Sequence, residues 1–372
     1  MIWIIISSVV IFAMRAMIMF IGSSIERGKK NPNEDLDYKH SVSIIIPARN
    51  EESKIELCVR ALMNSDYDKN LFRLYVVNDR SDDRTGEIID KLSEEFDNLT
   101  ALHIKSDSEK SNLRGKPGAL HYGIQASNGE IIMMTDADCL VNHKWISTVV
   151  NRFRNKNVGL VPSYTLIKGE SAFDKIQAVE WIYMHTMASA GVGWNNPLGC
   201  YGNNLSIRRS VYDMIGGYPN IKFSVTEDLA LLKAVFKSGY QVNYLCDYDS
   251  TVHTLPTENF KEYISQHKRW AVGGIDLGMN AVLFTLTSLA VWIGLIVALI
   301  AFKPVWILAV LFTRIIGDYI IIKPVMNILK ENRLYSWIIP AVGFFMLMEL
   351  IVPPLLLDSR IVWKGQTFNK RS

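Results

Sequence analysis

The sequence has little cysteine, little net charge, and no internal repeat or low-complexity linker. Its four cysteines stand far apart, without the close pairs of a metal site or a disulfide framework, so we expect buried, reduced thiols in a cytosolic compartment. A formal net charge of +3 is too small to indicate binding of nucleic acid, and no block of Lys and Arg alternates with aromatic residues. The four thiols belong to Cys58, Cys139, Cys200 and Cys246.

Apolar residues are concentrated at the two ends of the chain. The segments 1–21, 281–302, 304–322 and 336–357 are each mostly apolar and close to the ~20 residues that a helix needs to cross a bilayer. Residues 22–280 instead alternate like a soluble domain. We therefore expect an N-terminal transmembrane anchor over 1–21, an enzyme-sized cytoplasmic domain with interfacial helices over 22–280, a C-terminal transmembrane region over 281–357 and a basic tail over 358–372.

The first segment differs from a cleaved signal peptide. It has no basic start, it contains Arg15, and no convincing run of small residues follows it as a cleavage site. We interpret it as a retained anchor. Arg27, Lys29 and Lys30 come next, and because positive residues favour the cytoplasmic side, they predict a multi-pass protein of the cytoplasmic membrane whose main domain faces the cytoplasm.

The last apolar segment leaves two topologies open. If every segment crosses the membrane, the basic residues of the tail lie outside, against the positive-inside tendency. A helix broken at Pro353-Pro354 would instead be re-entrant or interfacial and would keep the tail inside. The basic residues concerned are Arg360, Lys364, Lys370 and Arg371.

Strands and helices alternate in the first part of the 22–280 domain. Runs of β-branched and apolar residues predict strands over 42–46, 74–77, 99–104 and 131–134, with helices between them. Such alternation indicates an α/β fold with right-handed crossovers and a mostly parallel sheet, which binds ligands beyond the carboxyl ends of its strands. The loops at these ends carry Glu51, Asp79, and the pair Asp136 and Asp138.

The stretch IIMMTDADCL runs from an apolar strand into two carboxylates, Asp136 and Asp138. Residues two apart in an extended chain point the same way, so both side chains can face one point beyond the strand. A magnesium-like ion suits that point, since it takes one or two carboxylates and completes its shell with water and phosphate oxygens. In the alternative interpretation, Asp136 only ends the strand and Asn142 caps a helix that begins near His143.

Several motifs follow one another along the chain. They are Pro47-Ala48-Arg49-Asn50-Glu51-Glu52, Asp79, Gly115-Lys116-Pro117-Gly118-Ala119-Leu120, Thr135-Asp136-Ala137-Asp138, Thr226-Glu227-Asp228 and Gln266-His267-Lys268-Arg269-Trp270. In their order and spacing, the chain resembles the membrane-bound family 2 glycosyltransferases from about Val42 to Trp270, together with the flanking apolar segments. The resemblance implies a GT-A fold, a nucleotide-diphosphate sugar donor (above all a UDP-sugar), a divalent cation (Mg²⁺ or Mn²⁺) and inversion at the anomeric carbon.

On the donor side, the resemblance assigns roles residue by residue. It implies Ala48, Glu51 and Asp79 for the nucleoside pocket, Lys116 beside the uracil or diphosphate, Asp136 for the ribose and a metal-bound water, Asp138 for the metal itself, and Arg269 for the donor phosphate. No glycine-rich loop of the P-loop type is present, so the cation has more of the phosphate charge to neutralise. Arg49 and Arg80 depart from the family, where Tyr and Gly are common; each either contacts phosphate or is simply exposed.

On the acceptor side, the resemblance makes Asp228 the base that takes the proton from the attacking hydroxyl, because a hydroxyl is a poor nucleophile until it loses that proton. A plainer interpretation is also open, since an acidic residue in the first turn of a helix matches the helix dipole. The residues assigned to acceptor binding are Glu227, Gln266, Trp270 and Asn203.

Apolar residues at helical spacing make the segments 171–188 and 260–270 amphipathic. Two such helices next to membrane spans would lie at the interface and bring the site to the lipid headgroups. Alternatively, their apolar faces pack against the core of the domain.

Together these patterns predict an inverting, metal-dependent glycosyltransferase that acts on a lipid-embedded hydroxyl acceptor at the cytoplasmic face of a membrane. A processive polysaccharide synthase is the alternative, although the C-terminal segments are few for the tunnel that it needs. From other classes, a non-catalytic scaffold would not need all these motifs. A transporter would carry a polar site within the membrane, whereas the charged residues of the apolar segments are interpreted as scattered: Arg15, Arg314, Asp318 and Glu349.

Overall fold

The computed structural model describes residues 1–29, 39–111, 113, 115–222, 224–358, 360–363 and 366–369. The chain divides into two compact units. The sheet unit consists of Lys29–Lys168 and Gly199–Leu255, and the helical unit consists of Met1–Gly28, Gly169–Leu198 and Pro256–Ser372. Part of the predicted topology depends on Lys30, Lys364, Lys370 and Arg371, which lie outside the described residues.

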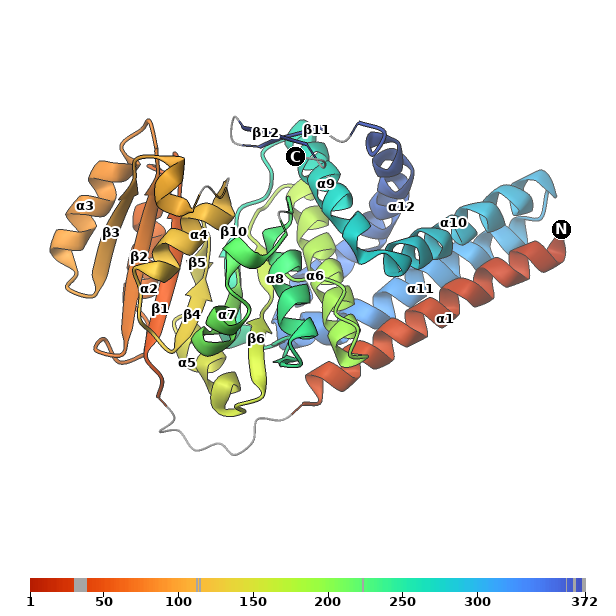
Figure 1. Ribbon diagram of the computed structural model, residues 1–372. Coiled ribbons are helices and arrows are strands. Elements are labelled where there is room, and N and C mark those ends of the chain that lie inside the picture. Colours follow the sequence, from red (N-terminus) through yellow and green to blue (C-terminus); the bar gives the residue numbers. More distant parts are fainter. Residues whose placement is uncertain are drawn as a thin grey trace. The chain divides into compact units, whose positions relative to one another are not determined.

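The sheet unit alternates strands with helices along the chain (Figure 1). Its main strands are β1 (Val42–Ala48), β2 (Phe72–Asp79), β3 (Leu99–Ile104), β4 (Ile131–Met134), β6 (Val158–Pro162), β8 (Leu205–Arg208) and β9 (Gln241–Val242). Its helices include α2 (Ile55–Met63), α3 (Thr85–Glu95), α4 (Lys116–Gln125), α5 (Trp145–Val150), α7 (Arg209–Met214) and α8 (Glu227–Lys237). The predicted strands 99–104 and 131–134 coincide with β3 and β4, whereas β1 continues past the predicted end at Ile46.

These strands form one sheet in the order β3-β2-β1-β4-β8-β6-β9. The strands β1 to β4 pair in parallel, as do β6 and β9, while β8 runs antiparallel to both of its neighbours. The predicted α/β fold with a mostly parallel sheet is therefore confirmed. A smaller sheet has the order β5-β10-β7, from β5 (Leu140–Val141), β10 (Val252–Thr254) and β7 (Thr165–Ile167).

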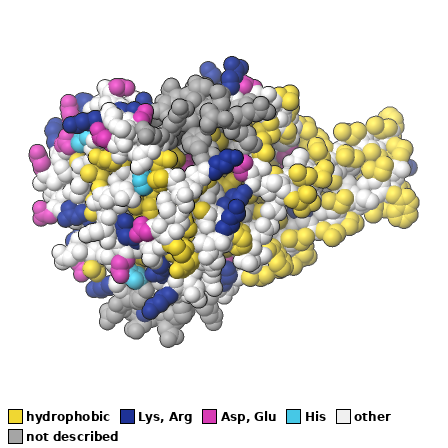
Figure 2. All heavy atoms as spheres, viewed as in Figure 1, with side chains coloured by type: hydrophobic (Ala, Val, Ile, Leu, Met, Phe, Trp, Pro, Cys, Tyr) yellow, Lys and Arg dark blue, Asp and Glu magenta, His cyan; other side chains and the backbone are white. Residues whose placement is uncertain are grey.

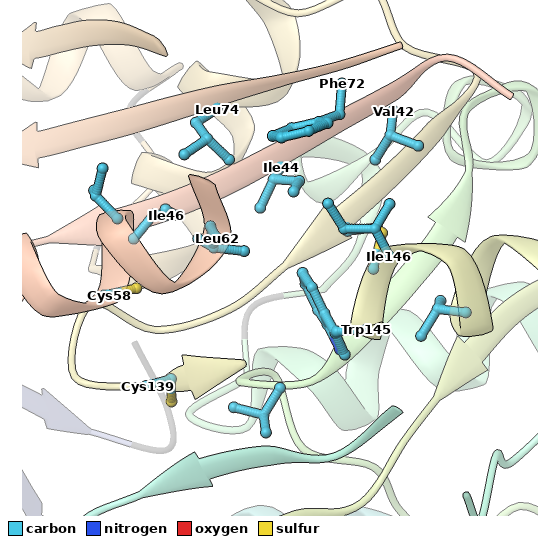
Figure 3. Close-up of a cluster of buried hydrophobic side chains, with 14 of the residues drawn as sticks. Val42, Ile44, Ile46, Cys58, Leu62, Phe72, Leu74, Cys139, Trp145 and Ile146 are labelled. Carbon is cyan, nitrogen blue, oxygen red and sulfur yellow. The ribbon is translucent and has the colours of Figure 1, made fainter. Parts of the chain in front are cut away.

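Helices cover both faces of the main sheet. Ile44 and Ile46 of β1 belong to a buried cluster with Leu62 of α2, which Figure 3 shows together with Trp145 of α5. Successive residues of a strand point to opposite faces, so Ile45 points the other way. On that face α4 packs so closely that a Cβ added to its Gly123 would lie 2.7 Å from Ile45.

The helical unit contains four helices that are long and apolar enough to cross a membrane, among the described residues. Figure 2 shows hydrophobic side chains gathered over α1, α10 and α11. The four candidate spans are Ile2–Arg27 (α1), Met279–Ile300 (α10), Pro304–Ile328 (α11) and Asn332–Leu355, with mean hydropathies of 2.5, 2.4, 2.0 and 2.0. The helix α12 (Ile338–Leu355) contains Pro353-Pro354 in its last turn and ends one residue after them.

The two amphipathic segments belong to a different part of the structure than predicted. The helices α6 (Ala172–Gly193) and α9 (Phe260–Gly274) belong to the helical unit, where α6 packs against α1, α11 and α12, and α9 against α12. The range 22–280 is therefore divided between the two units. Most of α6 is buried, whereas α9 buries Tyr263 and Val272 but leaves Phe260 49% exposed. The tail also forms an antiparallel hairpin of β11 (Arg360–Trp363) and β12 (Gln366–Asn369).

Charged residues of the long helices are brought together rather than scattered. Arg15 of α1 donates hydrogen bonds to the Ser288 hydroxyl of α10 (2.9 Å) and the Tyr183 hydroxyl of α6 (2.9 Å). On α11, Arg314 donates to Asp318 (2.7 Å) and to Glu349 of α12 (2.9 Å). The ring of Phe12 lies 5.4 Å from the Arg15 guanidinium and 5.0 Å from that of Arg314. We call Arg15, Tyr183, Arg314, Asp318 and Glu349 the arginine network.

Candidate active site

The predicted donor residues follow three neighbouring strands. Ala48 ends β1, Asp79 ends β2, and Asp136 comes two residues after β4. In the parallel pairing, Ala48 lies opposite Asn78 and Ile45 opposite Met134. All three loops therefore leave the sheet at the same edge, as a doubly wound sheet requires for its ligand site.

The loop after β1 is held by the loop after β2. The Asn50 N–H donates to the Ser81 hydroxyl (3.0 Å), and the Asp82 N–H donates to the Asn50 side-chain oxygen (2.9 Å). Asn50 has φ 55°, a left-handed conformation that Asn tolerates better than most residues. The Glu51 N–H donates to the Thr85 hydroxyl at the start of α3 (2.8 Å), which fixes Glu51 at the sheet edge.

Asp79 is buried and already paired. The Arg80 Nε donates to Asp79 Oδ1 (3.0 Å), and the other side of the same guanidinium lies 3.1 Å from Asp107 Oδ1. Arg80 has φ 56°, so it occupies the left-handed conformation that Gly adopts freely. The Arg80 side chain is 31% exposed and contacts two carboxylates. The sequence had suggested either a contact with phosphate or a simply exposed side chain.

Asp136 and Asp138 lie among other acidic groups. Burial raises the pKa of Asp138, and the charges of Asp136 and Glu51 raise it further. In the described part of the chain, no group of three or more His, Cys, Asp or Glu side chains is arranged to hold a metal ion. Two carboxylates with excess negative charge nevertheless fit a hard divalent cation that takes its remaining ligands from water and substrate phosphate.

Lys116 joins the donor residues to the predicted acceptor motif. Its Nζ lies 2.5 Å from Asp136 Oδ1 and 3.6 Å from Glu227 Oε1. Burial alone would lower the pKa of Lys116, but the charges of Asp136, Glu227 and Asp228 outweigh it and hold this pKa above its ordinary value. Lys116 therefore carries its charge and balances part of the acidic cluster.

Asp228 is fixed by two backbone N–H groups. The Gly202 N–H donates to its Oδ2 (2.9 Å) and the Leu229 N–H to its Oδ1 (2.7 Å). A Cβ added to Gly202 would lie 3.3 Å from Lys116 Nζ and 3.4 Å from Glu227 Oε1. The helix-cap interpretation accounts for the contact with Leu229 but not for the one with Gly202, which comes from a distant loop. We call Glu51, Asp136, Asp138, Glu227 and Asp228 the carboxylate cluster.

Asn203 lies in the same loop as Gly202. It is 7% exposed, and its side-chain oxygen accepts a hydrogen bond from the Thr165 hydroxyl (2.9 Å). This hydrogen bond links Asn203 to the smaller sheet, because Thr165 is the first residue of β7.

Buried thiols contact this region, which sequence reasoning missed. The Cys58 thiol lies 3.5 Å from the Asp136 carbonyl oxygen, the Cys139 thiol 3.5 Å from Asp138 Oδ1, and the Cys200 thiol 3.3 Å from the Asp228 carbonyl oxygen. Burial raises the pKa of each of these thiols, so they stay protonated and donate. The expectation of buried, unpaired cysteines is confirmed for these three, while Cys246 is partly exposed.

The remaining predicted residues belong to the helical unit. Gln266, Arg269 and Trp270 lie on α9, and all three are partly exposed. The Trp270 ring packs edge-on against Trp181 of α6, with ring centroids 5.7 Å apart, and against His267, with centroids 5.0 Å apart.

Comparison with known proteins gives a family match over the whole chain: the sequence model of glycosyl transferase family 21 matches residues 1–372. A probable glycosyltransferase, YdaM of Bacillus subtilis, is 29% identical over 67% of this chain and 58% of its own length. The β-monoglucosyldiacylglycerol synthase of Trichormus variabilis is 29% identical over 63% of this chain and 48% of its own length. The chain thus spans about half the length of these relatives.

Two further proteins extend the comparison. The glycosyltransferase AglE of Haloferax volcanii is 27% identical over 71% of this chain and 81% of its own length. Among solved structures, the mannosyltransferase PcManGT of Pyrobaculum calidifontis, in complex with GDP-Man and Mn²⁺, has a TM-score of 0.59 and 17% identity over 92% of this chain and 95% of its own. The likeness to PcManGT confirms a fold shared with a glycosyltransferase. The family model that matches is that of family 21, whereas the motifs suggested family 2.

Proposed function

The chain belongs to glycosyl transferase family 21, and we propose that it is a membrane-bound, inverting glycosyltransferase that moves one sugar from a nucleoside diphosphate donor to a lipid hydroxyl. One observation carries the proposal. Lys116 lies between Asp136 and Glu227, so the carboxylates proposed for the donor and the motif proposed for the acceptor meet in one unit.

Donor binding is proposed at the sheet edge. Ala48, Glu51 and Asp79 would line the nucleoside pocket, which the hydrogen bonds between the loops after β1 and β2 hold in shape. Lys116 would face the diphosphate with its ammonium group. A UDP-sugar is the donor that the motifs favour, and a GDP-sugar is its main competitor because PcManGT is complexed with GDP-Man.

The proposed cation site uses residues that already suit it. Asp138 and Asp136 supply oxygen ligands at the carboxyl end of β4. A bound Mg²⁺ or Mn²⁺ would stabilise the negative charge that develops on the leaving diphosphate. Arg269 of α9 is proposed as a further contact of the donor phosphate.

Proton transfer is proposed at Asp228. Its oxygens accept backbone hydrogen bonds that fix the carboxylate, and an ionised carboxylate is a group that can take the proton of the acceptor hydroxyl. The deprotonated hydroxyl would attack the anomeric carbon opposite the diphosphate, which inverts that centre in a single displacement. Glu227, Gln266, Asn203 and Trp270 are proposed to bind the acceptor.

A lipid acceptor is supported by the long apolar helices and by the relative named β-monoglucosyldiacylglycerol synthase. Insertion of α1, α10, α11 and α12 in the cytoplasmic membrane, with the catalytic residues on the cytoplasmic side, would place the reaction beside its substrate. The second candidate is polysaccharide synthesis, because a poly-β-1,6-N-acetyl-D-glucosamine synthase of Staphylococcus aureus is 24% identical over 67% of this chain.

A transfer assay tests the proposal. The full chain in nanodiscs containing dioleoylglycerol is supplied with UDP-glucose, UDP-N-acetylglucosamine or GDP-mannose and MnCl₂, and the products are analysed by mass spectrometry. We expect a lipid that carries one added sugar. A ladder of products would favour the polysaccharide synthase, and a folded protein that neither transfers nor hydrolyses any of these donors would overturn the proposal in favour of a scaffold.

A further inference from the structure

A buried acidic side chain lies in the middle of α6. Glu180 is 7% exposed, and its neighbours on this helix include the buried apolar residues Val179, Trp181 and Ile182. Burying a carboxylate is costly unless hydrogen bonds compensate for the lost water. Such a residue in a helix of the helical unit therefore calls for partners.

Two residues of α9 supply these partners. The Tyr263 hydroxyl lies 2.7 Å from both Glu180 oxygens, and His267 Nε2 lies 3.0 Å from Glu180 Oε1. Tyr263 and His267 are 1% and 8% exposed, so the whole group is shielded from solvent. Burial raises the pKa of Tyr263, and the charge of Glu180 raises it further, so the hydroxyl keeps its proton and donates.

The second nitrogen of His267 settles the hydrogen-bond pattern. His267 Nδ1 lies 2.8 Å from the Tyr263 carbonyl oxygen, which can only accept. Nδ1 therefore carries a proton, and Nε2 faces a carboxylate oxygen. Both ring nitrogens therefore have a hydrogen-bond partner, which gives the ring a bond of fixed direction on each side. The imidazole is consequently fixed in one orientation.

This fixed imidazole packs against Trp270. The rings of Tyr263 and His267 have centroids 3.9 Å apart, and the His267 and Trp270 rings meet at 64° with centroids 5.0 Å apart. On its other side, Trp270 meets Trp181 at 71° with centroids 5.7 Å apart. Trp181 follows Glu180 on α6, so the same helix turn supplies both the ion partner of His267 and the second ring against Trp270.

We propose that Glu180, Tyr263 and His267 form a positioning triad that fixes the indole of Trp270 for the acceptor. The proposal rests on the proposed function, in which Trp270 contacts the acceptor. Apolar residues in place of Glu180 and Tyr263 could fill the same space around His267. They would not fix the orientation of its imidazole, whereas a fully hydrogen-bonded polar network does. Glu180, Tyr263 and His267 act through Trp270 and need not touch the substrate.

The variants separate orientation from packing. Glu180→Ala and Tyr263→Phe remove hydrogen bonds of the triad. Glu180→Gln should restore much of the function, because an amide can donate to a neutral His267 and still accept from Tyr263. The matched control is Gln177→Ala, one turn earlier on α6. Gln177 is 1% exposed, and its side-chain oxygen accepts hydrogen bonds from Thr257 (3.0 Å from its N–H, 2.9 Å from its hydroxyl), so its substitution removes buried hydrogen bonds that are not part of the triad.

Two readouts are combined on the full chain in dioleoylglycerol nanodiscs. The first is fluorine NMR of protein labelled with fluorotryptophan, in which Trp270→Phe identifies the Trp270 resonance. We expect Glu180→Ala and Tyr263→Phe to shift or broaden this resonance, and Gln177→Ala to leave it in place. This readout requires no activity, so it tests the triad even if the proposed reaction fails.

The second readout is transfer kinetics. We expect Glu180→Ala to lower kcat/KM for the lipid acceptor by about 10- to 100-fold, since a misplaced contact costs that much, while the affinity for the nucleotide sugar is unchanged. Glu180→Gln should recover most of the loss. The proposal is overturned if the Trp270 resonance is unchanged in folded Glu180→Ala and Tyr263→Phe, or if Gln177→Ala alters the resonance and the acceptor kinetics equally.

Discussion

Replacing Lys116 with Met tests the central electrostatic contact of the carboxylate cluster. Methionine keeps much of the length and apolar stem of lysine but removes the ammonium group. That group lies 2.5 Å from Asp136 Oδ1 and 3.6 Å from Glu227 Oε1. The substitution therefore leaves two carboxylates without the positive charge between them.

The cost follows from the burial of the three side chains. Removing one partner of a buried ion pair costs about 3–5 kcal/mol. Glu227 is 10% exposed and Lys116 13%, but Asp136 is 34% exposed, so water screens part of the charge that is left. We expect a loss of about 2–3 kcal/mol, which lowers the melting temperature by roughly 5–10 °C in a domain of about 200 residues.

The matched control is Lys144→Met. Lys144 Nζ lies 3.9 Å from Asp249 Oδ2, and the two side chains are 58% and 39% exposed. An exposed pair of this kind contributes at most about 1 kcal/mol. Thermal unfolding of the full chain in detergent, followed by scanning fluorimetry, compares both variants with the unchanged protein.

Added MnCl₂ supplies the second comparison. A cation that binds the carboxylate cluster only in the folded state stabilises the folded protein by mass action. Because Lys116→Met lacks the ammonium group beside these carboxylates, MnCl₂ should raise its melting temperature more than that of the unchanged protein. A buried ion pair at Lys116 is refuted if Lys116→Met is no less stable than Lys144→Met, and a cation site beside it is refuted if MnCl₂ stabilises all three proteins equally.

Three further substitutions test the proposed roles. Asp228→Asn should lower the transfer rate by ~10²- to 10⁴-fold while donor binding is unchanged. The rate is measured at saturating donor, with Glu227→Gln in parallel. If Asp228→Asn keeps more than about a tenth of the rate, Asp228 is not the base. Asp138→Ala should abolish metal-dependent donor binding in calorimetry, and an affinity within about twofold of the original would contradict the metal assignment. Gly202→Ala should slow transfer, because the new Cβ would lie 3.3 Å from Lys116 Nζ, whereas Gly343→Ala, whose Cβ meets nothing within 4 Å, should not.

The sheet and its ligand edge were predictable because they depend on local patterns. The run Ile131–Met134 is apolar on both faces, as a strand covered on both faces of its sheet must be, and the structure gives it the same bounds. Strand ends were harder to predict, since Pro47 stays within β1, paired opposite Val77. Proline lacks the N–H that a strand residue can donate, yet β1 continues through Pro47 beyond the predicted bound at Ile46.

Partners distant in sequence were not predictable. Arg314 and Asp318 are four residues apart on one helix face, which the sequence does show, but Glu349 joins them only because α11 and α12 pack together. The pairs Lys116–Glu227 and Arg80–Asp107 likewise join residues that are distant in sequence and meet only through the tertiary fold. A motif predicts which residue types a site needs, whereas the tertiary fold decides which charges meet.

The two buried charge groups differ in balance, and this difference indicates where a ligand is needed. In the arginine network, Arg314 pairs with both Asp318 and Glu349, while Arg15 bonds to the Tyr183 hydroxyl and lies over the same Phe12 ring as Arg314. The network thus holds two positive and two negative groups, and its formal charges balance. The carboxylate cluster instead has five acidic groups near the ammonium groups of Lys116 and Lys54. Burial raises the pKa of Asp138, and the charges of Asp136 and Glu51 raise it further, so burial and neighbouring negative charge both disfavour the ionised form. A cation added at the carboxylate cluster would relieve that excess, whereas one added at the arginine network would create a new imbalance.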